Sequence, residues 1–127
     1  MQRLSLLLVV GILATLLGGQ TASALPPFNK EWIAKYVTGN SNANFVAAAG
    51  AAKCNVCHKG TSKKDHNEYG VALKKFITKK GYDAVKANPV AAAKYITDGL
   101  ASGEGEKSTA GKTFGELIKE GKLPGEP

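Results

Sequence analysis

Both cysteines and both histidines of the 127-residue chain lie in one short stretch, residues 54–66. The cysteines are three positions apart, and a histidine follows the second one directly. A disulfide, a metal site, a redox dithiol and the covalent attachment of a prosthetic group all use cysteine. Each of them needs a different spacing, compartment and fold. The rest of the sequence therefore has to decide which chemistry this stretch performs.

The first 24 residues, 1–24, have the pattern of a signal peptide that is cleaved. Arg3 gives a basic start, an apolar run extends from Leu4 to Leu17, and small residues lead to an A-x-A-like site at Ala24. The run has 14 residues, fewer than the roughly 20 that a membrane-spanning helix needs. We therefore expect a periplasmic or secreted protein with no stable membrane insertion after cleavage. An uncleaved anchor is the alternative.

The remaining chain, residues 25–127, has the size of one domain. It holds sixteen lysines against ten acidic residues, a net charge of +6, and the single arginine of the sequence, Arg3, lies in the signal. Recognition of phosphates and base edges favours the planar guanidinium fork of arginine, so we expect no nucleic-acid partner. The lysines serve solubility or, alternatively, docking to an acidic protein.

Helix-capping and helix-ending residues recur along the mature chain, while the alternating apolar runs typical of strands are absent. The pattern predicts about five short helices with glycine-rich links, and hence an all-α domain. They are expected from Asn29 to Gly39, from Ala43 to Lys53, from Asn67 to Lys80, from Asn88 to Gly103, and from a capping box at Thr113 and Glu116 onward.

Large apolar side chains are few for such a chain, so the core of the predicted helices is thin. The aromatic residues at helical core spacing are Trp32, Tyr36, Phe45, Tyr69, Phe76, Tyr95 and Phe114. The helix at 43–53 is rich in alanine, whose small side chain permits close approach of something bulky. We therefore expect a flat apolar group to fill the centre of the domain against this helix.

Cys54-Asn55-Val56-Cys57-His58 has the C-x-x-C-H spacing of a covalent haem site. Two thiols at this spacing reach two vinyl groups on neighbouring positions of a porphyrin, and the histidine directly after them reaches the iron. We predict Cys54 and Cys57 as thioether anchors of one haem c and His58 as the proximal iron ligand. The export signal agrees, because covalent attachment takes place outside the cytoplasm.

With this motif, an export signal and a mature length that suits one haem, the chain resembles the single-haem cytochromes c. The specific match is five residues, 54–58, while the compatible layout covers most of the mature chain. The resemblance implies a cytochrome c-like all-α fold around the haem and electron transport between redox protein partners. It implies an electron carrier rather than an enzyme.

The other uses of a cysteine pair fit less well. A disulfide between Cys54 and Cys57 closes a very small loop and stabilises little on the chain-entropy model. A thioredoxin-like dithiol belongs to a βαβ unit, and the sequence predicts no strand. A zinc site built from the two cysteines, His58 and His66 needs two adjacent residues to turn toward one metal.

The resemblance has one departure, which concerns the second axial ligand. Met1 is the one methionine and leaves with the signal, so a methionine sulfur cannot bind the iron of the mature protein. His66 is the candidate distal ligand, since the eight residues from His58 to His66 span up to about 26 Å when extended. A five-coordinate iron, or ligation by Lys63 or Lys64, is the alternative.

Two other function classes remain beside the electron carrier. An open or weakly held sixth iron position suits a haem-based gas or redox sensor. A haem enzyme acting on a small substrate is the third class, but one histidine is already assigned to iron, and no acid/base pair is apparent.

Overall fold

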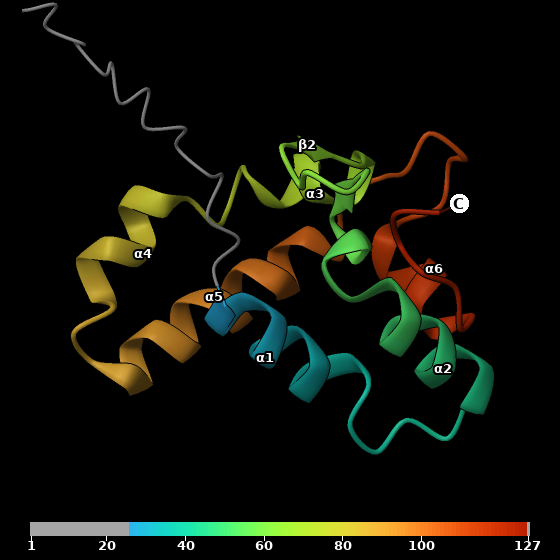
Figure 1. Ribbon diagram of the computed structural model, residues 1–127, viewed down its shortest axis with the longest axis horizontal. Coiled ribbons are helices and arrows are strands. Elements are labelled where there is room, and N and C mark those ends of the chain that lie inside the picture. The colour runs from blue at the N-terminus through green and yellow to red at the C-terminus, as the bar shows by residue number, and fades with distance from the viewer. Residues whose placement is uncertain (1–25, 127) are drawn as a thin grey trace, which may run out of the picture.

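The computed structural model describes residues 26–126, and these form a mostly helical fold (Figure 1). The helices are α1 (Pro26–Tyr36), α2 (Ala43–Ala52), α3 (Glu68–Leu73), α4 (Lys79–Val85), α5 (Pro89–Gly103) and α6 (Phe114–Lys119). A 3-10 turn, η1 (Lys53–Val56), and two short antiparallel strands, β1 (His58–Lys59) and β2 (Asp65–His66), connect α2 to α3. Helix therefore dominates as predicted, whereas the small sheet was not predicted. The expected signal peptide, residues 1–24, lies outside the described residues.

Helix α5 is the longest helix of the described part and packs against α1, α3 and α4. In Figure 1, α4 lies at one end of the molecule and α2 with α6 at the other. The core between them contains the fully buried side chains of Trp32, Phe45, Tyr69, Ile96 and Phe114. None of the helices within residues 26–126 has the length and apolarity needed to cross a membrane.

Most of the predicted helix ends are confirmed. Asn88 accepts hydrogen bonds from the backbone N–H groups of Val90 and Ala91 and begins α5. Thr113 and Glu116 form the predicted capping box at the start of α6. The first helix is an exception, because α1 already includes Pro26 and Asn29 lies inside it.

The single helix predicted for residues 67–80 is wrong, because the structure has two helices there. Thr78 begins α4 by accepting a hydrogen bond from the N–H of Gly81, and its own N–H donates to the hydroxyl of Tyr95 at 3.0 Å. Gly81 lies within α4 instead of ending a helix, and a Cβ there would approach the Tyr95 hydroxyl to 2.1 Å. Contact with α5 therefore breaks the helix that local pattern favours.

Candidate functional site

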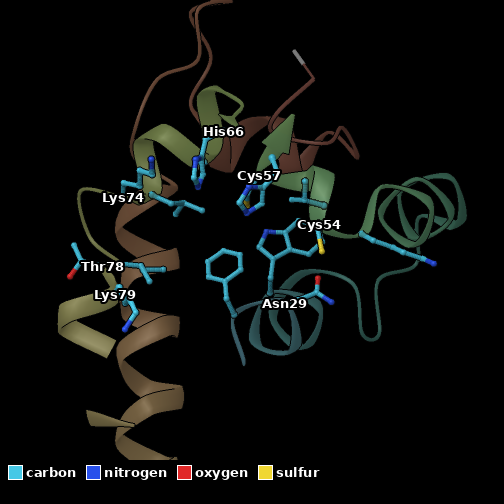
Figure 2. A pocket seen from close by; sticks show the side chains of 15 residues that line it. Asn29, Cys54, Cys57, His66, Lys74, Thr78 and Lys79 are labelled. Carbon is cyan, nitrogen blue, oxygen red and sulfur yellow. The ribbon is translucent and has the colours of Figure 1, made fainter. Parts of the chain in front are cut away.

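A cavity of about 480 Å³ lies between α1, η1, the two strands, α3 and the chain that leads into α4. This volume falls within the roughly 300–1,000 Å³ of ordinary small-molecule sites. Its wall consists of Phe28, Asn29, Trp32, Lys53, Cys54, Val56, Cys57, His58, His66, Gly70, Leu73, Lys74, Ile77, Thr78 and Lys79. In Figure 2, Cys54 lies on one side of the cavity, and Lys74 and Lys79 lie on the other. All four residues predicted for the site belong to this wall.

The two cysteines come from the tight turn that ends α2. The backbone N–H of Cys57 donates to the carbonyl of Cys54 at 3.2 Å, which closes the turn. Both cysteines are free thiols; Cys54 is exposed and Cys57 is buried. Lys53, directly before them, has φ 48° and ψ −119°, a conformation that costs a non-glycine residue about 1–3 kcal/mol. The chain therefore bends sharply where α2 gives way to the cysteine turn.

The surroundings of Cys57 favour its thiol over its thiolate. Burial raises the pKa of Cys57 to about 12, and the nearby Cys54 adds to the effect. Redox-active Cys-x-x-Cys pairs have the opposite property, a lowered pKa, and zinc binds the thiolate. In addition, no three histidine, cysteine or acidic side chains among residues 26–126 converge as metal ligands. The described part of the chain therefore offers no closed protein-only metal site.

His58 and His66 lie directly opposite each other in the two-stranded ladder. Their ring centroids are 4.4 Å apart with an angle of 38° between the planes. Directly paired residues of an antiparallel ladder project to the same face, so both imidazoles lie on one side of the ribbon. The two histidines are therefore neighbours on one face, whereas the sequence-based expectation places His66 on the far side of the iron from His58. His66 can lie on the opposite side of a flat ligand from His58 only if β1 and β2 separate.

Both histidines can act as metal ligands. Burial, followed by the charges of His58 and Lys74, lowers the pKa of His66, while Asp65 opposes the shift. The neutral imidazole, which is the form that binds metal, is therefore favoured at neutral pH. Nδ1 of His58 is buried and has no hydrogen-bond partner within residues 26–126. An unpaired buried nitrogen is costly, so the ring of His58 is suited to a partner that the polypeptide does not supply.

The lysines at the cavity differ from those that the sequence suggested. Neither Lys63 nor Lys64 belongs to its wall, and the ammonium of Lys63 donates to the side-chain oxygen of Asn55 and to the carbonyl of Gly60. Lys53, Lys74 and Lys79 line the cavity instead. These cations suit a ligand with an apolar body and anionic groups at its edge.

The expectation that the alanine-rich helix forms the wall is wrong. No residue of α2 lines the cavity, and the helix buries only Phe45 and Ala49. The apolar wall comes from residues such as Trp32 of α1 and Leu73 of α3. Of the aromatic residues predicted for the core, Trp32, Phe45, Tyr69 and Phe114 are buried and the others are partly buried.

Asn67 does not line the cavity but contacts the cysteine turn, a role that the sequence did not reveal. It precedes an apolar helical run, which identifies it as a helix cap, and its side chain does accept a hydrogen bond from the N–H of Gly70. The same side chain also donates to the carbonyls of Asn55 and Val56, between the cysteines. Nothing local signals this second role, because the partners lie eleven and twelve residues upstream.

Comparison of the chain with protein-family models, with curated proteins and with solved structures finds no match.

Proposed function

We propose that the chain is an exported single-haem c-type cytochrome that carries electrons between larger redox proteins. The observation that supports this most strongly is the composition of one cavity wall. Cys54, Cys57 and His58 all line a cavity of about 480 Å³ whose wall combines large apolar side chains with three lysines. The apolar residues are Phe28, Trp32, Val56, Leu73 and Ile77, and the lysines are Lys53, Lys74 and Lys79. Such a site is suited to a flat apolar macrocycle that carries carboxylates.

Each residue of the motif has a defined task in this proposal. The thiol of each cysteine would add across one vinyl double bond of the haem, so that a C–S and a C–H bond form while the S–H and the π bond break. This addition involves no oxidation or reduction and does not require a permanently ionised thiol. His58 would hold the iron through a ring nitrogen. When bound, the haem supplies the one-electron chemistry, and the chain sets the ligand, the dielectric and the access of solvent.

The apolar wall has a second task, which is to keep water from the cofactor. Trp32 is 1% exposed and lines the cavity, and its indole N–H donates to the hydroxyl of Tyr69 at 3.2 Å. This bond fixes the indole plane against the cavity. A dry and rigid surrounding limits the reorganisation that accompanies electron transfer.

The experiment for this proposal uses cysteine variants of the full-length chain, expressed in a host that matures c-type cytochromes. After denaturation and extraction, haem should stay on the wild-type polypeptide and on the single variants Cys54→Ser and Cys57→Ser, which each keep one thioether. The double variant should lose it completely. Haem that is extracted from the wild type as easily as from the double variant would rule out covalent attachment.

A second candidate function is a gas or redox sensor with an open or weakly held sixth iron position. It is favoured by the position of His66, which lies beside His58 on one face of the ribbon, with ring centroids 4.4 Å apart. If both imidazoles held one iron from opposite sides, their rings would have to lie farther apart than this. His66 reaches such a position only if β1 and β2 separate.

Absorption spectra of the wild type and of His66→Ala distinguish the two functions. In a carrier with His66 as distal ligand, the ferric wild type is low-spin, His66→Ala is high-spin, and the ferrous wild type binds carbon monoxide poorly. In a sensor, the wild type binds carbon monoxide readily, and His66→Ala has the same spectrum as the wild type. The second result would exclude His66 as an iron ligand and would leave the assignment of His58 unchanged.

A further inference from the structure

The side chain of Asn67 lies between the cysteine turn and α3, and it is almost fully buried, with 5% exposed. Its amide nitrogen Nδ2 donates to the carbonyl oxygens of Asn55 at 3.1 Å and of Val56 at 2.8 Å. Its Oδ1 accepts from the N–H of Gly70 at 2.9 Å. Both amide protons and the amide oxygen of the Asn67 side chain therefore take part in hydrogen bonds.

The backbone of Asn67 extends this contact by one residue. Its N–H donates to the carbonyl of Cys57 at 3.0 Å. Asn67 therefore binds the carbonyls of Asn55, Val56 and Cys57, which are the three peptide groups that lead to His58. Because the orientation of these groups sets the direction of the side chains on the turn, one residue determines how the motif faces the cavity.

Two glycines show how closely the chain packs around this residue. A Cβ on Gly70 would lie 2.2 Å from the carbonyl oxygen of Cys57. A Cβ on Gly125 would lie 2.0 Å from Nδ2 of Asn67 and 2.8 Å from the carbonyl oxygen of Val56. The neighbouring Pro124 is fully buried. The C-terminal segment thus covers the contact, and water has little access to compete for these hydrogen bonds.

We propose that Asn67 is a positioning residue that holds the Cys54–His58 turn in its attachment conformation before any cofactor is bound. All the bonds that carry the inference lie within the polypeptide, so the conformation does not depend on a ligand. The consequence for haem attachment rests on the proposed function. The order of the turn itself does not, and the two can be tested separately.

The variant Asn67→Asp separates this role from helix capping. Aspartate caps helices about as well as asparagine, so the bond to Gly70 persists. The variant loses both N–H donors, however, and places a carboxylate against two carbonyl oxygens. Asn88→Asp is the matched control, because Asn88 caps α5 through its side-chain oxygen alone among the described contacts.

The first measurement is the rate at which each thiol of the full-length, haem-free chain reacts with a thiol reagent. In the wild type, the buried Cys57 should react much more slowly than the exposed Cys54. In Asn67→Asp, the Cys57 rate should rise about tenfold or more, as expected for the loss of two buried hydrogen bonds. Asn88→Asp should leave the Cys57 rate unchanged.

Urea unfolding, measured in parallel, gives the change in global stability of each variant. The rise in the Cys57 rate should be larger than the rise that more frequent global unfolding alone would cause. Equal rates for both thiols in the haem-free wild type would overturn the proposal, as would an unchanged Cys57 rate in Asn67→Asp.

A second variant keeps the test valid if Asn67→Asp does not fold. Gly125→Ala keeps the Asn67 side chain but displaces its amide from outside, because the new Cβ would lie 2.0 Å from Nδ2. This variant should therefore also raise the Cys57 rate. Under maturation conditions, both variants should yield more single-thioether product than the wild type. If the wild type stays colourless but the thiol rates behave as stated, the proposed function fails and the positioning role stands. If haem attaches while the rates are unaffected by both variants, the positioning role fails alone.

Discussion

Tyr69 joins the cavity wall to the core through a single buried hydroxyl. It is fully buried, packs against Phe114 with ring centroids 5.1 Å apart, and accepts the indole N–H of Trp32. Burial raises the pKa of Tyr69 above its ordinary value, with Cys57 adding to the effect. The hydroxyl therefore stays protonated at physiological pH and keeps its fixed geometry.

The substitution Tyr69→Phe should lower the free energy of unfolding by about 1–3 kcal/mol, because it leaves the indole N–H of Trp32 buried without an acceptor. Urea unfolding measures the change. Tyr82→Phe is the control, since the hydroxyl of Tyr82 makes no hydrogen bond within residues 26–126. Its free energy of unfolding should stay close to that of the wild type. A Tyr69→Phe variant as stable as Tyr82→Phe would show that the bond contributes nothing.

Glu104 gives the molecule a defined dependence on pH. Burial alone would raise its pKa, but hydrogen bonds from Tyr36 at 2.7 Å and from Lys35 outweigh burial and lower it below the ordinary 4.5. A lowered folded pKa means that the ionised form stabilises the fold. This contribution is fully present above about pH 4.5 and is lost as the pH falls through the folded pKa.

Glu104→Gln should therefore lower the free energy of unfolding by about 1 kcal/mol at neutral pH. This value allows for the solvent exposure of Glu104 and Lys35. The difference from wild type should shrink as the pH falls below about 4.5, as followed by urea unfolding at several pH values. Asp98→Asn, in an exposed pair with Lys94, should change stability by less than about 0.5 kcal/mol. A Glu104→Gln cost that stays constant down to pH 3 would contradict this account.

At the scale of elements, α5 approaches its neighbours closely through two glycines. A Cβ on Gly99 would lie 2.3 Å from Cγ1 of Ile77, and one on Gly103 would lie 2.5 Å from Cδ2 of Leu73. Leu73 and Ile77 in turn line the cavity. The packing of α5 therefore fixes the position of the cavity wall opposite the cysteine turn.

Gly99→Ala and Gly103→Ala should each destabilise the fold by about 1–3 kcal/mol, as overpacked core positions do. Gly50→Ala in α2 is the matched control, because a Cβ there meets nothing within 4 Å. It should stabilise the protein by about 0.5–1 kcal/mol through the helix preference of alanine. Thermal unfolding of the three variants gives the comparison, and a gain in stability at Gly99 would show that α5 is less closely packed than described.

A helix or strand can be predicted from the sequence only where the residues that determine it lie close together in the chain. The Asn88 cap and the Thr113–Glu116 capping box use residues two or three positions apart, and the sequence predicts both correctly. The break between α3 and α4 depends on Tyr95, seventeen residues after Thr78, and no local pattern encodes it. The small sheet has the same cause, since strands of two residues carry no periodicity.

The candidate site divides in the same way. The C-x-x-C-H spacing brings Cys54, Cys57 and His58 to the cavity wall, as expected from five consecutive residues. The lysines at the cavity, Lys74 and Lys79, could not be predicted, because their position depends on how α3 and α4 pack against α5. The sequence therefore shows which residues the cysteine turn brings to the cavity, but not the side chains that the fold places opposite them.

At the scale of the whole molecule, the chain is basic, with a net charge of +7, and three lysines line the cavity. If the partner is an acidic redox protein, Lys74→Glu should slow electron transfer several-fold at low ionic strength. Lys119→Glu on α6 changes the net charge equally but lies outside the cavity wall, so it should slow the reaction less. Stopped-flow kinetics should show the variants converging with wild type near 1 M salt. A wild-type rate that does not change with salt would exclude electrostatic docking.

The most direct test of the account is the number of haem groups held covalently by the mature chain. Full-length protein is exported from a host that matures a second, known c-type cytochrome in the same cells, and is then analysed by pyridine haemochrome absorption and by intact mass. We expect one haem per polypeptide, with the mass of the mature chain increased by one haem. A colourless protein whose mass equals that of its amino acids, while the second cytochrome matures normally, would contradict it.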